Sequence, residues 1–258
     1  MFNSVVVILF GIIIGSFLNV CIYRIPKGES IVYPGSHCMT CKHPLNRLDL
    51  VPVLSFLFLK GRCRYCNQKI PSRYMAIELL TGLLYGVVYL KFGLSLELIM
   101  YATFIALLIV LTMIDSDHML LPTKIILFGA GLGIVFRSVQ AVLYHDVRFF
   151  IYPIVAAFIG YGLFYVTFYL AKLLLKKEGL GFGDVRLIGM LAIYLSVRLT
   201  FLTIFLASIL ASLYGLVLLY IKKKSEPFPF GPFINMGAII ALFYGESILI
   251  WYLRLAGL

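Results

Sequence analysis

Long apolar runs recur along the whole chain, and they constrain the fold more than any other feature. Of the 258 residues, 62% are hydrophobic and only 13% are charged, which excludes a water-soluble domain. A transmembrane helix needs about 20 consecutive apolar residues, and most of the runs reach that length. The sequence therefore predicts an all-α polytopic membrane protein with about eight transmembrane helices, over residues 1–23, 74–90, 96–114, 124–144, 149–175, 185–196, 199–221 and 231–252.

The basic residues predict how these helices are oriented. A net charge of +11 could suggest a nucleic-acid partner, but Lys and Arg gather in the loops between apolar runs, so topology explains them and we expect no nucleic acid. With residues 24–73 in the cytoplasm, 17 of the 22 Lys and Arg lie inside, Lys176, Lys177 and Lys224 among them, 4 lie outside, and Arg137 lies within an apolar run. Both termini then face outward.

Two aspartates stand where an apolar run meets a polar stretch on the predicted cytoplasmic side, namely Asp115 and Asp184. An ionisable side chain there is costly and suggests a functional site, although a single Asp could simply be a solvated helix cap. Two carboxylates that share a proton can hydrolyse a peptide bond without a metal. Gly181 and Gly183 would let an extended substrate approach Asp184, because they lack Cβ atoms. We therefore expect a catalytic aspartate pair.

Four cysteines form two CxxC pairs in the one long polar segment, Cys38 with Cys41 and Cys63 with Cys66, separated by 21 residues. This spacing is typical of a closed tetrahedral zinc site, and the alternative of disulfides is disfavoured in a reducing cytoplasm. A segment this small needs a metal to fold. Cys21 lies in the first apolar run and is expected to be a packing residue.

These features divide the chain into three parts. We expect a first transmembrane helix over 1–23, a small cytoplasmic zinc-binding segment with four cysteine ligands over 24–73, and membrane-embedded peptidase helices over 74–258. Glu78 is expected either to face a polar cavity or to pair with a nearby Arg or Lys. Arg137 is expected to snorkel or to pair with an acid. Residues 227–232 contain three prolines and cannot be helical throughout.

Several motifs, in this order along nearly the whole chain, resemble those of the bacterial type IV prepilin peptidase family, a group of membrane GxGD aspartic proteases. They are Gly15-Ser-Phe-Leu-Asn-Val20 with Arg24-Ile-Pro26, the double CxxC segment, Ile114-Asp115 running to Leu121-Pro122, Gly181-Phe-Gly183-Asp184, and Pro229-Phe-Gly231-Pro232. The resemblance implies an enzyme of the bacterial inner membrane that cleaves the basic leader of prepilins and pseudopilins at the cytoplasmic face. Its catalytic aspartates fall on Asp115 and Asp184, and its four cysteines on the CxxC pairs.

The resemblance also implies methylation of the new amino terminus by S-adenosylmethionine. We expect that cofactor to bind at the 24–73 segment and Glu78, the largest cytoplasmic surface. Two positions depart from the family pattern, because Arg186 stands where Lys is usual and Thr123 where Asp is common. Asp117 and His118 are not expected to be catalytic.

Two other classes of function use the same features. An ion- or proton-coupled transporter would use the membrane-edge carboxylates, and it would be recognised by ion flux without peptide cleavage. An assembly scaffold would use the zinc segment and the basic loops to bind partners, and it would tolerate the loss of both aspartates.

Overall fold

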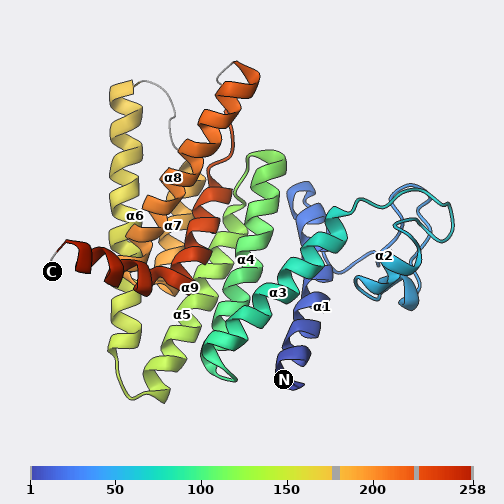
Figure 1. The fold of residues 1–258 in the computed structure, drawn as a ribbon, viewed down its shortest axis with the longest axis horizontal. Coiled ribbons are helices and arrows are strands. Elements are labelled where there is room, and N and C mark those ends of the chain that lie inside the picture. The colour runs from blue at the N-terminus through green and yellow to red at the C-terminus, as the bar shows by residue number, and fades with distance from the viewer. Residues whose placement is uncertain (1, 176–180, 224–226, 257–258) are drawn as a thin grey trace. The chain divides into compact units, whose positions relative to one another are not determined.

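The computed structural model describes residues 2–175, 181–223 and 227–256, so Lys176, Lys177 and Lys224 of the charge pattern lie outside the described residues. Long α-helices dominate this part of the chain (Figure 1). They are α1 (Phe2–Arg24), α3 (Arg73–Phe92), α4 (Leu96–His118), α5 (Thr123–Leu143), α6 (Arg148–Leu175), α7 (Phe182–Tyr194), α8 (Val197–Lys222) and α9 (Gly231–Leu255). The all-α prediction is confirmed.

Seven helices in the described ranges are long and apolar enough to cross a membrane, one fewer than expected. The exception is α7, whose 13 residues correspond to roughly 20 Å of helix, whereas a hydrocarbon core is about 30 Å thick. From Asp184 to Tyr194 nearly every residue of α7 is buried. This helix is therefore an inner element enclosed by other helices and is too short to be a full span.

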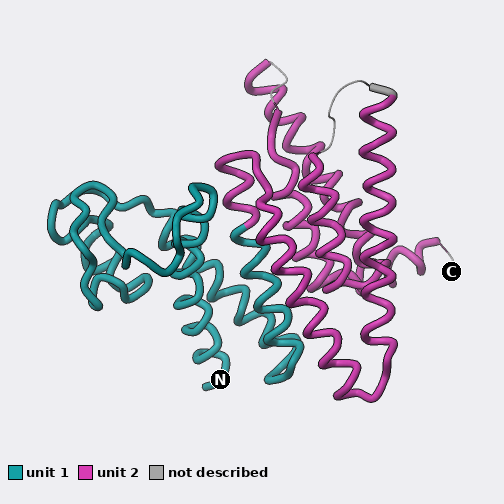
Figure 2. Tube along the Cα trace, turned by 180° about the vertical axis from the view of Figure 1, so that it is seen from behind, with its two compact units in different colours: residues 1–110 teal, residues 111–258 magenta. Residues whose placement is uncertain are grey.

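The chain divides into two compact units, residues 1–110 and 111–258 (Figure 2). In unit 1, α1 packs against α3 through small residues. A Cβ on Gly15 would lie 2.7 Å from the Glu78 backbone, and one on Gly11 would lie 2.9 Å from that of Gly82. Such close backbone approach between apolar helices is the usual role of glycine in membranes. It brings the segment between α1 and α3, and Glu78 of α3, beside α1.

The segment between α1 and α3 contains only short elements, η1 (Ile25–Lys27), η2 (Arg47–Leu50) and α2 (Leu54–Phe58). Each CxxC pair lies in a tight turn that is closed by one antiparallel bridge, His37 with Pro44 and Arg62 with Lys69. Arg24, buried at the end of α1, donates to the backbone carbonyls of Ser30 and Gly35. These local contacts leave the segment with little apolar core of its own.

In unit 2, α7 packs against α5, α6, α8 and α9. The contact with α5 is close because a Cβ on Gly133 would lie 2.8 Å from the Tyr194 ring. The Tyr194 hydroxyl donates to the Gly129 carbonyl at 2.7 Å. Tyr194 thus ties the carboxyl end of α7 to the middle of α5.

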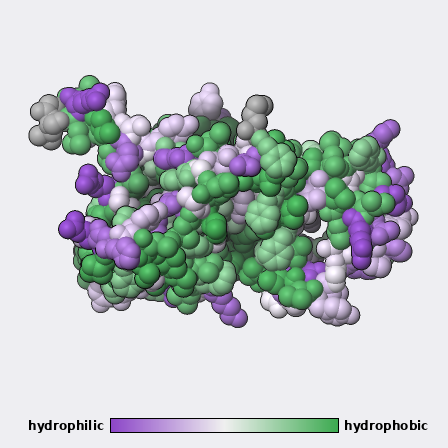
Figure 3. Space-filling view, turned by 90° about the horizontal axis from the view of Figure 1, so that it is seen from below, coloured by the Kyte–Doolittle hydropathy of each residue, from purple (hydrophilic) through white to green (hydrophobic). Residues whose placement is uncertain are grey.

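Many large hydrophobic side chains are exposed on the described helices, including Phe10, Phe158, Phe205 and Trp251. Green, hydrophobic side chains cover much of the surface seen in Figure 3. Patches this large are rare on soluble monomers. Together with the seven apolar helices, they indicate a multi-pass membrane protein.

Candidate active site and cysteine cluster

Asp115 lies one turn before the end of α4, and its side chain is buried. Its Oδ2 accepts a hydrogen bond from the backbone N–H of Gly231 at 3.1 Å. One helical turn away along both helices, Asn235 Nδ2 donates to Thr112 Oγ1 at 2.9 Å. These two bonds align the end of α4 with the start of α9.

Asp184 is the third residue of α7 and is also buried. Its Oδ2 accepts from the Gly181 N–H at 3.2 Å, and its own N–H donates to the Gly181 carbonyl at 3.0 Å. A carboxylate in the first turn also interacts favourably with the amino-terminal end of the helix dipole. The local fold therefore holds the Asp184 carboxylate over the start of its own helix.

The tertiary structure brings the two aspartates together. Their carboxylates are close enough to interact electrostatically. Leu121, in the connection between α4 and α5, contacts both neighbourhoods, because Cβ atoms on Gly183 and Gly231 would lie 2.9 Å and 3.3 Å from its side chain. Two acids from distant parts of the sequence thus share one buried site.

The structure shows which atoms lie beside the two glycines that precede Asp184, and the sequence did not reveal these neighbours. Leu121 fills the space beside Gly183, while a Cβ on Gly181 would lie 3.1 Å from Asp184 Oδ2. A Cβ would therefore overlap Leu121 at Gly183 and would crowd the carboxylate at Gly181, and the expected approach of a substrate strand stays a prediction.

Gly231 is the site residue that sequence reasoning missed. It belongs to the proline-containing stretch before the last helix, in which residues 227–230 are not helical, as expected. Its contact with Asp115 crosses 116 positions of sequence. The motif was visible in the sequence, but its partner was not.

The two departures from the family pattern contact each other. Arg186 donates through Nη1 to Thr123 Oγ1, and its guanidinium lies 4.3 Å from the centre of the Phe182 ring. This contact joins the first turns of α5 and α7, just beside Asp184. The pair of substitutions therefore keeps a polar link at this position.

The hydrogen bonds of Arg137 go to neutral acceptors and not to the acid that was one of its two expected partners, while snorkelling stays a prediction. Its guanidinium donates to the carbonyls of Ile193 and Tyr194 at the end of α7, and to Gln140 Oε1 at 2.9 Å. The last carbonyls of a helix lack partners within the helix, so they are good acceptors for a cation. Arg137 thus caps α7 and does not use an acidic partner for these bonds.

The four predicted cysteines come together in unit 1, with their sulfur atoms all within 4.8 Å of one another. They are free thiols, and the Cys38 and Cys66 sulfurs are 3.8 Å apart. A tetrahedral zinc with Zn–S bonds of about 2.3 Å would place its sulfurs about 3.8 Å apart. A backbone hydrogen bond from Cys41 lowers the pKa of the Cys38 thiol, while the pKa of the neighbouring Cys66 thiol is raised, so the first thiolate of the cluster forms at Cys38. The residues fit zinc.

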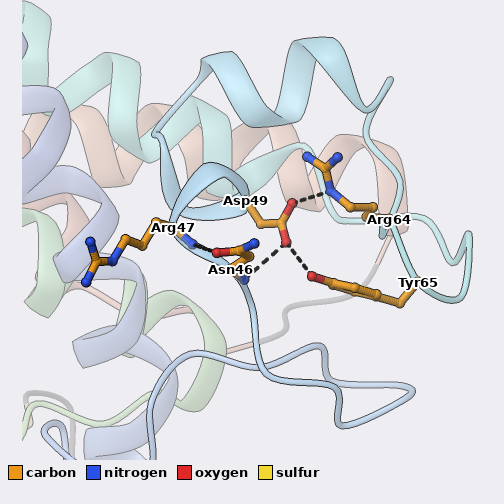
Figure 4. Close-up of polar contacts among 5 residues, drawn as sticks. All are labelled: Asn46, Arg47, Asp49, Arg64 and Tyr65. Carbon is orange, nitrogen blue, oxygen red and sulfur yellow. Dashed lines mark hydrogen bonds and ion pairs between the residues drawn. The ribbon is translucent and has the colours of Figure 1, made fainter.

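Asp49 stabilises the second of the two cysteine turns (Figure 4). Its carboxylate accepts from Arg64 Nε at 2.7 Å, from the Tyr65 hydroxyl at 3.1 Å and from the Asn46 N–H at 3.2 Å. Burial opposes its ionisation, but these hydrogen bonds and the charge of Arg64 outweigh burial, and the pKa of Asp49 is lowered. Since Arg64 and Tyr65 lie between Cys63 and Cys66, the network orients two of the four ligands.

A cavity of about 310 Å³ lies in unit 1 beside the cysteine cluster. It is lined by α1, α3 and the segment between them, with Asn19, Tyr23, Tyr74 and Glu78 among its walls. Glu78 is buried and accepts a hydrogen bond from the Val53 N–H at 2.7 Å. This donor is a backbone group and not the Arg or Lys that was one of the two expectations. Val53 has φ of 63°, which a β-branched residue seldom adopts.

Comparison with known families gives two matches that together cover most of the chain. The bacterial peptidase A24 N-terminal domain family matches residues 9–92, and the type IV leader peptidase family matches residues 102–216. No solved structure matches the chain significantly.

Curated relatives match almost end to end. A Bacillus subtilis protein named prepilin leader peptidase/N-methyltransferase is 34% identical over 97% of this chain and 98% of its own. Proteins of the same name from Aeromonas salmonicida and Pseudomonas aeruginosa are 33% and 32% identical, over 96% and 97% of this chain and 92% and 93% of their own.

Proposed function

This chain belongs to the type IV leader peptidase family, and from that we propose that it removes the leader peptide of type IV prepilins and pseudopilins and then methylates the new amino terminus. The single observation that carries the peptidase proposal is the shared buried site of Asp115 and Asp184. The alternative of an ion-coupled transporter finds no support in the relatives, whose shared name describes a peptidase and methyltransferase.

In the proposed cleavage step, one aspartate is ionised and the other is protonated. The ionised carboxylate takes a proton from a water molecule as that water attacks the scissile carbonyl carbon, and the other carboxyl group donates its proton to the carbonyl oxygen. The hydrogen bonds from Gly231 and Gly181 hold each carboxyl group in position without occupying both of its oxygens. Among the residues that the structure describes, the second oxygen of each acid has no such bond, which leaves it for water or substrate.

The positive-inside pattern supports an active site at the cytoplasmic face of the inner membrane. A prepilin has a basic leader followed by an apolar helix, so the same rule places its cleavage point at that surface. The scissile bond must leave helical geometry before a protease can reach its backbone groups.

The zinc proposal predicts about one zinc ion per chain, because four thiolates complete a tetrahedral site. Replacing Cys38 with Ser should remove most of the zinc and loosen the 24–73 segment, since metal binding supplies its folding energy. Metal content by inductively coupled plasma mass spectrometry checks this. Cys21→Ala is the matched control, because Cys21 is buried in α1 outside the cluster. Freshly purified protein with intact thiols and no metal would contradict the proposal.

For the methyltransferase, we propose that the cavity beside the cysteine cluster holds S-adenosylmethionine. Its 310 Å³ falls within the size of small-molecule sites, and it combines aromatic faces with a few polar groups. S-adenosylmethionine supplies the methyl group when bound. Glu78 is the buried carboxylate of the cavity, and we assign it the removal of the proton from the substrate amine, because only a neutral amine is nucleophilic.

Replacing Glu78 with Gln should reduce methylation about 100-fold while cleavage continues, because proton acceptors of this kind contribute about that much. Gln keeps an oxygen for the Val53 N–H, so the local fold should persist. Mass spectrometry of a prepilin cleaved with and without S-adenosylmethionine measures both activities in one sample. Glu246→Gln, an exposed position on α9, is the control. Full methylation by Glu78→Gln would exclude this role.

A further inference from the structure

A second cavity, of about 490 Å³, lies in unit 2 at the far end of α5 from the aspartates. Helix α5 begins at Thr123, whose hydroxyl contacts the helix that carries Asp184, and it ends at Leu143. Its 21 residues correspond to roughly 30 Å of helix, close to the thickness of a hydrocarbon core. The α5 to α6 turn, which carries Asp146 and Arg148 of the cavity, therefore lies near one membrane surface when Thr123 and Asp184 lie near the other. Figure 1 shows the α5 to α6 turn at that end of the helices.

Positive charge collects at this cavity, which we call the arginine pocket. Its charged lining residues are Arg137, Asp146, Arg148 and Arg198, so that cations exceed anions by two. Arg148 Nε is 3.8 Å from Asp146 Oδ1, a loose ion pair in which the arginine side chain stays 71% exposed. Within the part of the chain that the structure describes, the exposed Arg198 side chain has no hydrogen bond or ion pair. Two guanidinium groups are thus available to an anion.

The remaining walls of the arginine pocket are mostly apolar. They are formed by Phe149, Tyr152, Pro153, Leu195, Ser196 and Val197. A small hydrophilic anion would gain nothing from such walls. A ligand with a phosphate head and an apolar body would satisfy both the arginines and the walls, and phospholipids have this chemistry and lie at this depth.

We propose that the arginine pocket binds the phosphate of an anionic phospholipid, in the leaflet opposite the two aspartates. Arg148 and Arg198 contact the phosphate oxygens, for which a guanidinium group offers paired donors. Phe149, Tyr152 and Pro153 of α6 contact the glycerol and upper acyl chain. Arg137 stays on the carbonyls of α7, so the site and the end of α7 share one wall.

Native mass spectrometry of the full chain, released from detergent, tests this proposal. Phosphatidylglycerol should remain bound more strongly than phosphatidylcholine with the same acyl chains, because phosphatidylcholine carries a compensating positive charge. Replacing Arg148 and Arg198 together with Gln should weaken retention of phosphatidylglycerol roughly 30-fold, from the usual worth of two basic residues near a lipid surface. Inorganic phosphate at millimolar concentration should not displace the lipid.

The control variant replaces Lys91 and Arg254 with Gln, which removes the same charge outside the pocket and should retain the lipid. Equal retention of phosphatidylglycerol by the pocket variant and by the control would overturn the proposal, as would equal retention of the two lipids by the unaltered protein. Displacement by inorganic phosphate would show a site for the free ion instead. Gel filtration, together with prepilin cleavage at the two aspartates, reports whether each variant is folded.

Discussion

Asn at position 115 or position 184 is expected to lower leader cleavage by about 10⁴-fold, the scale seen when one member of a cooperating catalytic set is lost. Each change leaves the shape of the side chain and its hydrogen-bond acceptor for Gly231 or Gly181 intact. What it removes is the carboxyl group that gives or takes a proton. The double variant should be hardly slower than either single one, because one carboxyl group cannot perform both proton transfers.

Cleavage of a purified prepilin, followed by mass spectrometry of the products, measures this loss. Asp117→Asn is the matched control, since Asp117 is exposed and only two residues from Asp115. It should retain most activity. Zinc content and gel filtration should be unchanged in all four variants. Substantial cleavage by a folded Asp184→Asn protein would exclude the aspartate pair, and dependence on Asp117 in place of Asp115 would move the pair by two residues.

Replacing Gly231 with Ala is expected to lower cleavage about 100-fold, because displacing a catalytic group by about 1 Å can cost that much. The added Cβ would lie 2.6 Å from Asp115 Oδ2 and 3.3 Å from the Leu121 side chain. Both neighbours are buried, so the carboxylate has to move away from its position beside the Gly231 N–H. The chemistry of both aspartates is kept while their geometry changes.

Gly131→Ala, in α5, is the control for that change, because a Cβ there meets no atom within 4 Å. It should cleave normally and be slightly more stable, since Ala favours helix over Gly. The same cleavage assay compares the two alanine variants, with thermal unfolding recorded for each. Normal cleavage by Gly231→Ala would mean that the Gly231 contact does not position Asp115.

The helices could be predicted because their signal is local. Runs of apolar residues with Pro, Gly or charged residues at their ends predicted eight ranges, and each corresponds to a helix with ends within a few residues. Residues 185–196 were predicted to span the membrane and do not. They form a helix, α7, but it is buried among its neighbours and is too short to span. Sequence patterns show how apolar a segment is, and they do not show whether lipid or protein surrounds it.

The cysteine cluster and the buried charged residues show the same contrast between local signals and long-range contacts. Cysteine spacing alone predicted a cluster of four thiols, because two CxxC turns have few other uses and each turn closes locally. The partners of Glu78, Arg137 and Asp115 could not be predicted, because each is a backbone group far away in sequence: the Val53 N–H, the carbonyls that end α7, and the Gly231 N–H. Every residue carries such backbone groups, so no residue type marks them. Only the packing of the helices selects which of them a buried charge will meet.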